Sequence, residues 1–191
     1  MATMIDRMIR AVKLDVDFYN EAEADTSLNQ EALLIVVIVS VAGGIGSLIG
    51  GLFSGDFGAA LLGAVLAIVL GVVNYYIWSY VTYFVGTNLF DGTADAGEML
   101  RVLGYAHTPR LLSLLSFIPC VGPILSLAGA VLSLVAAVIA VREALDFDTG
   151  KAVITCLIGW VVILVISVVL GMILGVGAIG VGAVTSTLGG G

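Results

Sequence analysis

A glycine-rich segment near the end of the sequence has the spacing of a dinucleotide-binding turn. Gly175, Gly177 and Gly180 follow the pattern GxGxxG. That pattern binds a dinucleotide when a strand precedes it, a helix follows it, and an acidic residue stands about 20 positions further on. The segment instead follows a long apolar run, and no acidic residue comes after Gly180. We interpret it as the glycine-rich end of a membrane span.

A second segment shares residues with phosphate-binding loops. Asp148, Thr149, Gly150 and Lys151 resemble the end of such a loop, but a leucine, Leu145, occupies the position of the required leading glycine. We therefore expect a helix cap and a lysine that anchors the helix at the membrane surface.

The histidine and the two cysteines have no neighbours that would complete a metal or redox site. His107 is the one histidine of the sequence, and no acidic or sulfur ligand stands at a suitable spacing from it. Cys120 and Cys156 belong to no CxxC pair, and we expect two free thiols at opposite ends of their spans. The sequence thus predicts no catalytic residues, no cofactor and no metal, and so a protein that is not an enzyme.

Composition places the chain in a membrane. Of its 191 residues, 60% are hydrophobic and 11% are charged, and a span needs about 20 mostly apolar residues. We predict an all-α integral membrane protein with about five transmembrane helices, preceded by an N-terminal amphipathic helix. The predicted spans cover about residues 32–53, 58–85, 100–117, 124–141 and 152–175.

The third span is expected to be irregular. Gly104 and Pro109 interrupt it, so a kink or a partly re-entrant path is possible. Thr93 or Asp95 is expected to cap its first helix. Pro119 and Pro123 are expected to bracket a tight turn before the fourth span.

The N-terminal segment has apolar residues at helical spacing, from Met4 to Tyr19, with charged residues mostly between them. Such a helix can lie in the headgroup plane with its cations toward anionic lipid, or dock on the cytoplasmic face of the bundle. Residues 21–25 are expected to form an acidic connector, and Ser27 with Gln30 a capping box. We expect three parts: residues 1–30 cytoplasmic, residues 31–176 transmembrane, and residues 177–191 a glycine-rich tail.

The cations predict the orientation, because lysine and arginine accumulate in short cytoplasmic loops. A five-span path lets all seven cations lie toward one side. We therefore expect a multi-pass protein of the cell membrane with a cytoplasmic N-terminus and the C-terminus outside. Arg110 lies within the third span, so its side chain must snorkel or the helix must begin later.

Small residues in the first span predict close helix packing. They are spaced so that another helix backbone can approach, and they are Gly43, Gly46, Ser47, Gly50 and Gly51. The helix they meet can be another span of the chain, another membrane protein or a second copy. Membrane lipids are the other expected partners. Nucleic acid is not, because the net charge is −7.

Spans three and four are joined by the short proline turn, so their far ends should lie close together at the cytoplasmic face. We expect a candidate interaction surface there, formed by Tyr105, His107, Arg110, Arg142, Glu143 and Lys151. The alternative is an ordinary solvated rim.

Several motifs resemble the Yip1 domain family. They are Gly104-Tyr105-Ala106-His107-Thr108-Pro109, Ile118-Pro119, Gly122-Pro123, Val141-Arg142-Glu143-Ala144-Leu145 and Thr149-Gly150-Lys151-Ala152. The resemblance covers about residues 5–176 and implies the five-span fold. Eukaryotic members are linked to vesicle traffic, membrane shaping and Rab GTPase binding. That role relies on a long cytosolic N-terminal region, whereas about 30 residues precede the first predicted span here.

Three functional hypotheses follow. The leading one is a non-enzymatic membrane organising or interaction protein of the Yip1-like type, because the sequence has helix-packing motifs and no predicted catalytic residues. The alternatives are a small-solute or ion channel or transporter, for which the broken third span would be the motif, and an accessory subunit of a larger membrane complex.

Overall fold

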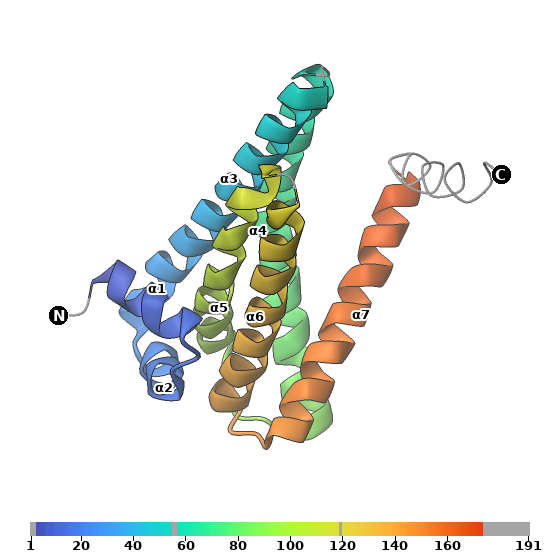
Figure 1. Ribbon diagram of the computed structural model, residues 1–191. Helices are drawn as coiled ribbons and strands as arrows, with labels where there is room; N and C mark the ends of the chain where they lie inside the picture. Colours follow the sequence, from blue (N-terminus) through green and yellow to red (C-terminus); the bar gives the residue numbers. More distant parts are fainter. Residues whose placement is uncertain (1–2, 55–56, 119, 174–191) are drawn as a thin grey trace.

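The computed structural model describes residues 3–54, 57–118 and 120–173, and these are helical over most of their length. Figure 1 shows the arrangement of the helices. In chain order the elements are α1 (Met4–Val12), α2 (Val16–Ala24), η1 (Thr26–Leu28), α3 (Asn29–Ser54), α4 (Phe57–Phe90), α5 (Ala96–Ala106), η2 (Thr108–Phe117), α6 (Val121–Ala144) and α7 (Thr149–Ile173).

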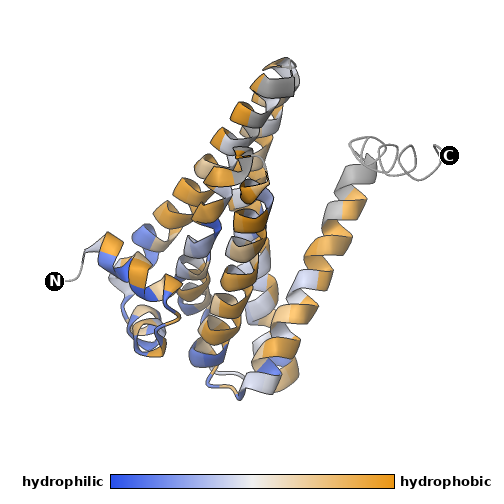
Figure 2. Ribbon diagram, viewed as in Figure 1, coloured by the Kyte–Doolittle hydropathy of each residue, from blue (hydrophilic) through white to orange (hydrophobic). Residues whose placement is uncertain are grey.

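Four segments of the described chain are long and apolar enough to cross a membrane: Thr26–Gly46, Ala60–Phe90, Val121–Ala144 and Thr149–Ile166. Large apolar side chains such as Leu62, Leu127 and Val161 are more than half exposed along these helices, as lipid-facing residues would be. Figure 2 shows that hydrophobic residues predominate along the long helices. The prediction of an all-α integral membrane protein is confirmed.

The third predicted span is divided into α5 and the 3-10 helix η2. The α-helix ends at Ala106, where Pro109 would lack an N–H for the next turn and would restrict the residue before it. Two hydroxyl groups satisfy carbonyls left free at this helix end. Thr108 donates to the Tyr105 carbonyl at 2.7 Å, and Ser133 of α6 donates to that of Ala106. The predicted interruption is confirmed.

Capping at two helix starts agrees with the sequence analysis. Asp95 and Glu98 form a capping box at the start of α5, so Asp95, rather than Thr93, is the cap. Asp148 accepts a hydrogen bond from the Lys151 amide at 3.0 Å in the first turn of α7.

The N-terminal segment differs from the prediction. Two helices replace the single amphipathic one, because the chain reverses at Leu14, whose φ is 60°. Asp15 then caps α2 by accepting from the Phe18 amide at 3.3 Å. The expected acidic connector is mostly the last turns of α2. The expected capping box at Ser27 is wrong, because Asp25 accepts from the Ser27 amide at 2.9 Å and caps η1 instead.

The turn before α6 is tighter than predicted. Cys120 has a φ of 67°, and α6 begins at Val121 rather than after Pro123. Pro123 therefore lies in the first turn of the helix, where its missing N–H would have no partner in any case. Pro119 lies outside the described residues.

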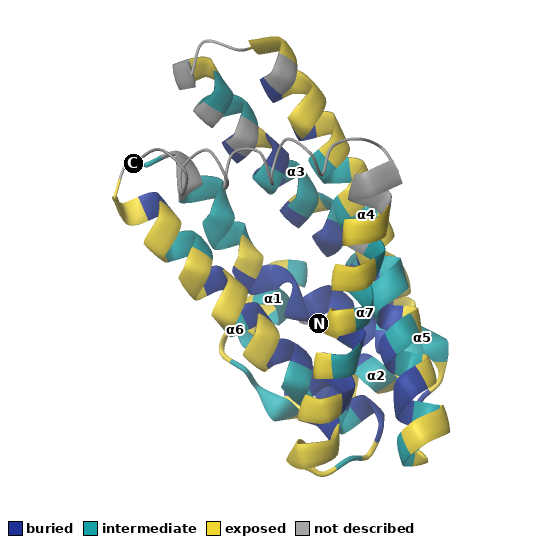
Figure 3. Ribbon diagram, turned by 90° about the vertical axis from the view of Figure 1, so that its right-hand side faces the viewer, coloured by how far each residue is buried: buried dark blue, intermediate teal, exposed yellow. Residues whose placement is uncertain are grey.

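The hydrophobic core lies at one end of the bundle, where α1 and α2 pack against α5 and α6. Figure 3 shows buried residues concentrated there, and the far half of the α3–α4 hairpin more exposed. The loops of residues 91–95 and 145–148 meet at the same end, because Thr93 donates a hydrogen bond to Asp146 at 2.8 Å. We call this end, with α1, α2 and the two loops, the polar end.

Candidate functional site

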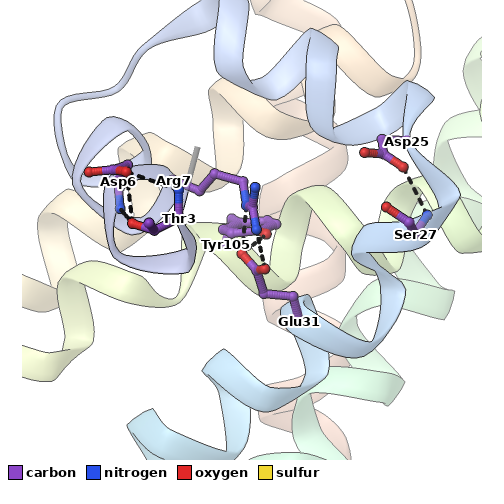
Figure 4. A network of polar contacts seen from close by, with 7 residues as sticks. All are labelled: Thr3, Asp6, Arg7, Asp25, Ser27, Glu31 and Tyr105. Atoms are coloured by element: carbon purple, nitrogen blue, oxygen red, sulfur yellow. Dashed lines mark hydrogen bonds and ion pairs between the residues drawn. The ribbon is translucent and has the colours of Figure 1, made fainter. Parts of the chain in front are cut away.

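A charged network at the polar end joins three helices that are distant in sequence. Arg7 of α1 donates from Nε to Glu31 of α3 at 2.7 Å and forms an ion pair with it. Tyr105 of α5 donates its hydroxyl to the same carboxylate. Figure 4 shows Arg7 and Tyr105 converging on Glu31. One acidic residue therefore holds α1 and α5 against the start of α3.

A second cation attaches α2 to the bundle. Arg101 of α5 is buried and donates to the carbonyl of Ala22 at 3.0 Å, to that of Glu23, and to Asn29 Oδ1 at 3.0 Å. A guanidinium group satisfies the free carbonyls at a helix C-terminus and complements its partial negative charge.

An aromatic contact packs α2 against α5. The Phe18 ring packs edge-on against Tyr105, with ring centroids 4.8 Å apart, and both residues are fully buried.

Three of the predicted surface residues lie on the rim of the polar end. Arg142 and Glu143 are in the last turn of α6, and Lys151 is in the first turn of α7. Arg142 donates to Glu143 at 2.6 Å, and both side chains are partly exposed. Lys151 is exposed and lies 5.5 Å from the centre of the Phe147 ring. Because solvent reaches and screens the ion pair of Arg142 with Glu143, it contributes little to stability.

His107 lies deeper in the bundle and is buried. Its Nδ1 is 2.7 Å from the Leu103 carbonyl, which can only accept, so Nδ1 carries the proton. The rings of Tyr75 and Trp78 pack edge-on to the imidazole, at 5.7 and 5.9 Å between centroids. The surroundings favour a structural histidine.

Arg110 lines two adjoining cavities together with His107 and Asn74. One cavity, of about 280 Å³, also contacts Trp78, Ser133 and Trp160. The other, of about 300 Å³, lies toward α3 and contacts residues that include Ser40 and Ser126. Arg110 is exposed and forms no ion pair with any described residue. The Arg110 side chain therefore does not reach the polar end, although snorkelling to that end was one of the two alternatives for this residue.

The six predicted surface residues thus lie at three levels. Arg142, Glu143 and Lys151 are on the rim, Tyr105 is buried beneath α1 and α2, and His107 with Arg110 lies at the cavities. No group of three or more His, Cys, Asp or Glu residues able to hold a metal ion occurs in the part of the chain that the structure describes. Within that part, Cys120 and Cys156 are free thiols.

The small residues of α3 have unequal surroundings. Gly46 is buried, and no described atom lies within 4 Å of the position a Cβ of Gly43 would take. Gly51 is partly exposed, and the side-chain environments of Ser47 and Gly50 lie outside the described residues. The close approaches of α3 to α4 instead involve Gly44, whose Cβ would lie 3.1 Å from the Ala64 carbonyl oxygen, and Gly71, whose Cβ would clash with the Ser40 hydroxyl oxygen.

Residues that the sequence analysis did not single out complete these sites. Glu31 had a readable signal, since it is an acidic residue at the entry to an apolar helix. Trp160 had none, because an aromatic residue in a span is ordinary. Only the fold places it beside Trp78.

Comparison with known families agrees with this architecture. The family model for the Yip1 domain matches residues 16–186. The chain belongs to the Yip1 domain family. The match begins at the start of α2 and includes every long helix, the broken α5–η2 segment and the cavities. No curated protein and no solved structure matches the chain.

Yip1 domain proteins are non-enzymatic membrane proteins, and this chain is a membrane protein of the Yip1 type. Gly104 and Pro109 lie on either side of the helix break, and Tyr105 joins this segment to Glu31.

Proposed function

We propose that this Yip1 domain protein is a non-enzymatic membrane organising protein, and that α1 acts as a wedge in one leaflet. The observation that carries the proposal is the orientation of α1 on the bundle. Ile5, Ile9 and Val12 are 68%, 47% and 39% exposed, and their spacing puts them on one face of the helix. Met4, Met8 and Ala11 pack inward.

The cations of α1 point toward protein rather than toward lipid. Arg7 pairs with Glu31, and Arg10 pairs with Asp15 at 2.7 Å and with Glu21 at 2.6 Å. The helix is therefore held by its charges and presents its apolar face outward. A helix in this arrangement lies crosswise to the spans (Figure 1) and buries its apolar face at the headgroup boundary.

A wedge of this kind expands one leaflet relative to the other. With the N-terminus in the cytoplasm, as the cations favour, the expanded leaflet is the cytoplasmic one. The proposal agrees with the membrane-shaping role that the family resemblance implies.

Reconstitution into large liposomes tests the proposal. The wild-type chain should reduce vesicle diameter or form tubules, seen by electron cryomicroscopy, in proportion to its density. Ile5→Ser/Ile9→Ser/Val12→Ser should abolish the effect, while Ile5→Leu/Ile9→Leu/Val12→Leu should retain it. Equal remodelling by both triple variants at matched density would rule out the wedge.

Transport is the second candidate, favoured by the two cavities halfway along the spans, whose lining includes Asn74, His107 and Arg110. The same liposomes, loaded with a panel of ions and small solutes, distinguish the two functions. Solute-selective flux that is lost in Asn74→Leu would establish transport in place of membrane organisation.

A further inference from the structure

We propose that the two adjoining cavities around Arg110 bind the acidic group of a membrane amphiphile, a carboxylate or a phosphate, with its chain directed toward the lipid. This site goes beyond the membrane-organising role proposed above, which depends on α1. Arg110 and Asn74 are the residues that bind the anion.

The cavities lie deep in the membrane. Asn74 is at the midpoint of α4 (Phe57–Phe90), Ser133 is near the midpoint of α6 (Val121–Ala144), and Trp160 is near that of α7 (Thr149–Ile173). All three residues line the first cavity with Arg110. A guanidinium group at this depth is costly unless it meets an anion or faces water.

The described protein does not supply that anion. Arg110 pairs with no described carboxylate, and its guanidinium and the Asn74 amide have no described hydrogen-bond partner. Of their polar neighbours in the cavities, His107 and Ser133 are engaged, whereas Trp78 Nε1 and Ser126 Oγ are buried without a hydrogen-bond partner among the described residues. His107 donates from Nδ1 to Leu103, and Ser133 donates to Ala106. One unpaired cation with a neighbouring amide suits a single oxyanion, because a guanidinium group can donate two parallel hydrogen bonds to it.

The rest of the lining favours an amphiphile over a free ion. Val131, Leu134 and Trp160 line the first cavity and are 53%, 45% and 55% exposed on the outer surface of α6 and α7. Those surfaces face lipid, so the cavity opens sideways into the hydrocarbon region. An acidic head can reach Arg110 from there while its chain stays among apolar side chains.

The chain carries its own reporter of this cavity. Its two tryptophans, Trp78 and Trp160, both line it. A dibromostearate quencher whose carboxylate pairs with Arg110 would therefore quench the whole tryptophan emission at saturation. The experiment uses the full chain in nanodiscs of neutral phosphatidylcholine, with dibromostearate or its uncharged methyl ester added.

Dibromostearate should quench saturably, with an apparent Kd at least about tenfold lower than that of the ester, since the ester lacks the charge. Arg110→Gln should remove that preference, and Arg142→Gln, a rim cation, should keep it. Arg110→Lys should retain part of it, which separates loss of charge from misfolding.

Three outcomes would overturn the proposal. Equal quenching by acid and ester in the wild-type chain would show simple partition into lipid. An unchanged preference in a folded Arg110→Gln variant would move the site elsewhere. If millimolar inorganic phosphate displaced dibromostearate with the same apparent affinity as the amphiphile itself, that result would assign the cavity to free anions. Loss of membrane remodelling in the α1 variants would leave this result unaffected, so the two proposals fail independently.

Discussion

Glu31 is the residue on which the packing of the polar end depends most. It accepts from Arg7 and from Tyr105, so it connects α1, α3 and α5 at one carboxylate. Both partners are at most partly exposed. Charge-assisted hydrogen bonds in such a setting are stronger than exposed ion pairs.

Removing the Tyr105 hydroxyl should weaken this connection measurably. Tyr105→Phe should lower the free energy of unfolding in detergent by about 1.5–3 kcal/mol, since one hydrogen bond to a charged group is lost. Thermal unfolding followed by circular dichroism measures the change. Tyr80→Phe, at a 51% exposed position, is the control and should change little. A stable Tyr105→Phe variant would show that Arg7 alone holds Glu31.

Glu23 gives the docking of α2 a pH dependence. Burial, together with Asp146, Glu98 and Glu143, raises its pKa to about 7, against the opposing effect of Arg101. A carboxyl group with a raised folded-state pKa favours folding when it is protonated. Stability should therefore fall as pH rises from about 4.5 to about 7, between the unfolded and folded pKa values.

Hydrogen–deuterium exchange of the α2 amides, corrected for intrinsic rates, measures this effect. Exchange should be faster at pH 8 than at pH 5.5, because Glu23 is then charged beside other acids. Glu23→Gln should remove the difference, and Asp17→Asn, exposed on the same helix, should keep it. The same pH dependence in both variants would assign it to another group.

At the scale of elements, the break between α5 and η2 is held by close backbone contact with its neighbours. A Cβ on Gly104 would lie 2.8 Å from the Ala32 Cβ and 3.0 Å from its carbonyl oxygen. One on Gly129 would lie 2.7 Å from the Pro109 carbonyl oxygen. These two glycines let α3 and α6 approach the broken segment on both sides.

Gly104→Ala should therefore destabilise the protein by about 1–3 kcal/mol, the usual cost of overpacking a core. Gly63→Ala is the matched control, because a Cβ there meets nothing within 4 Å. Urea or SDS titration in mixed micelles compares the two. Equal stability of both variants would mean that α3 shifts to accommodate the methyl group.

The elements that could be predicted are those whose signal lies within one segment. The four long spans follow from runs of apolar residues, and the break follows from Pro109. The reversal at Leu14 could not be predicted, because leucine gives no sign of a positive φ. The capping of η1 by Asp25 could not be told from the Ser27 pattern, because aspartate and serine are both preferred at helix N-caps.

For the whole molecule, the fold separates the charges. Six of the seven cations lie at the polar end, in α1, the turn after it, α5 and the segments next to the loop of residues 145–148. Cys120 lies at the opposite end, where α6 begins. The predicted orientation then puts Lys13, Glu98 and Lys151 in the cytoplasm and Cys120 outside. The predicted position of Asp56 lies outside the described residues.

Native Cys120 allows a direct measurement, because it is exposed while Cys156 is buried. An impermeant maleimide applied to intact cells should label the wild-type chain and fail to label Cys120→Ser. Lys151→Cys in the Cys120→Ser background should react only after the cells are opened. Labelling of position 151 in intact cells would reverse the topology.

The proposed sites show why position in sequence is a limited guide. Tyr105, His107 and Arg110 lie within six residues, yet the change from α-helix to 3-10 helix turns Tyr105 toward Glu31 and places Arg110 at the cavities. The cavity needs Asn74, Ser133 and Trp160 from three other helices. No spacing rule relates those positions, so the site arises only from packing.

The length of α4 has a consequence for where the protein can reside. At a rise of 1.5 Å per residue, its 34 residues extend over about 51 Å, while the hydrocarbon core is about 30 Å thick. With α6 at 24 residues, the α3–α4 hairpin projects past its neighbours (Figure 1). Unequal spans create hydrophobic mismatch, which tilting or local thickening of the bilayer relieves. Membranes of greater thickness should therefore retain this protein preferentially.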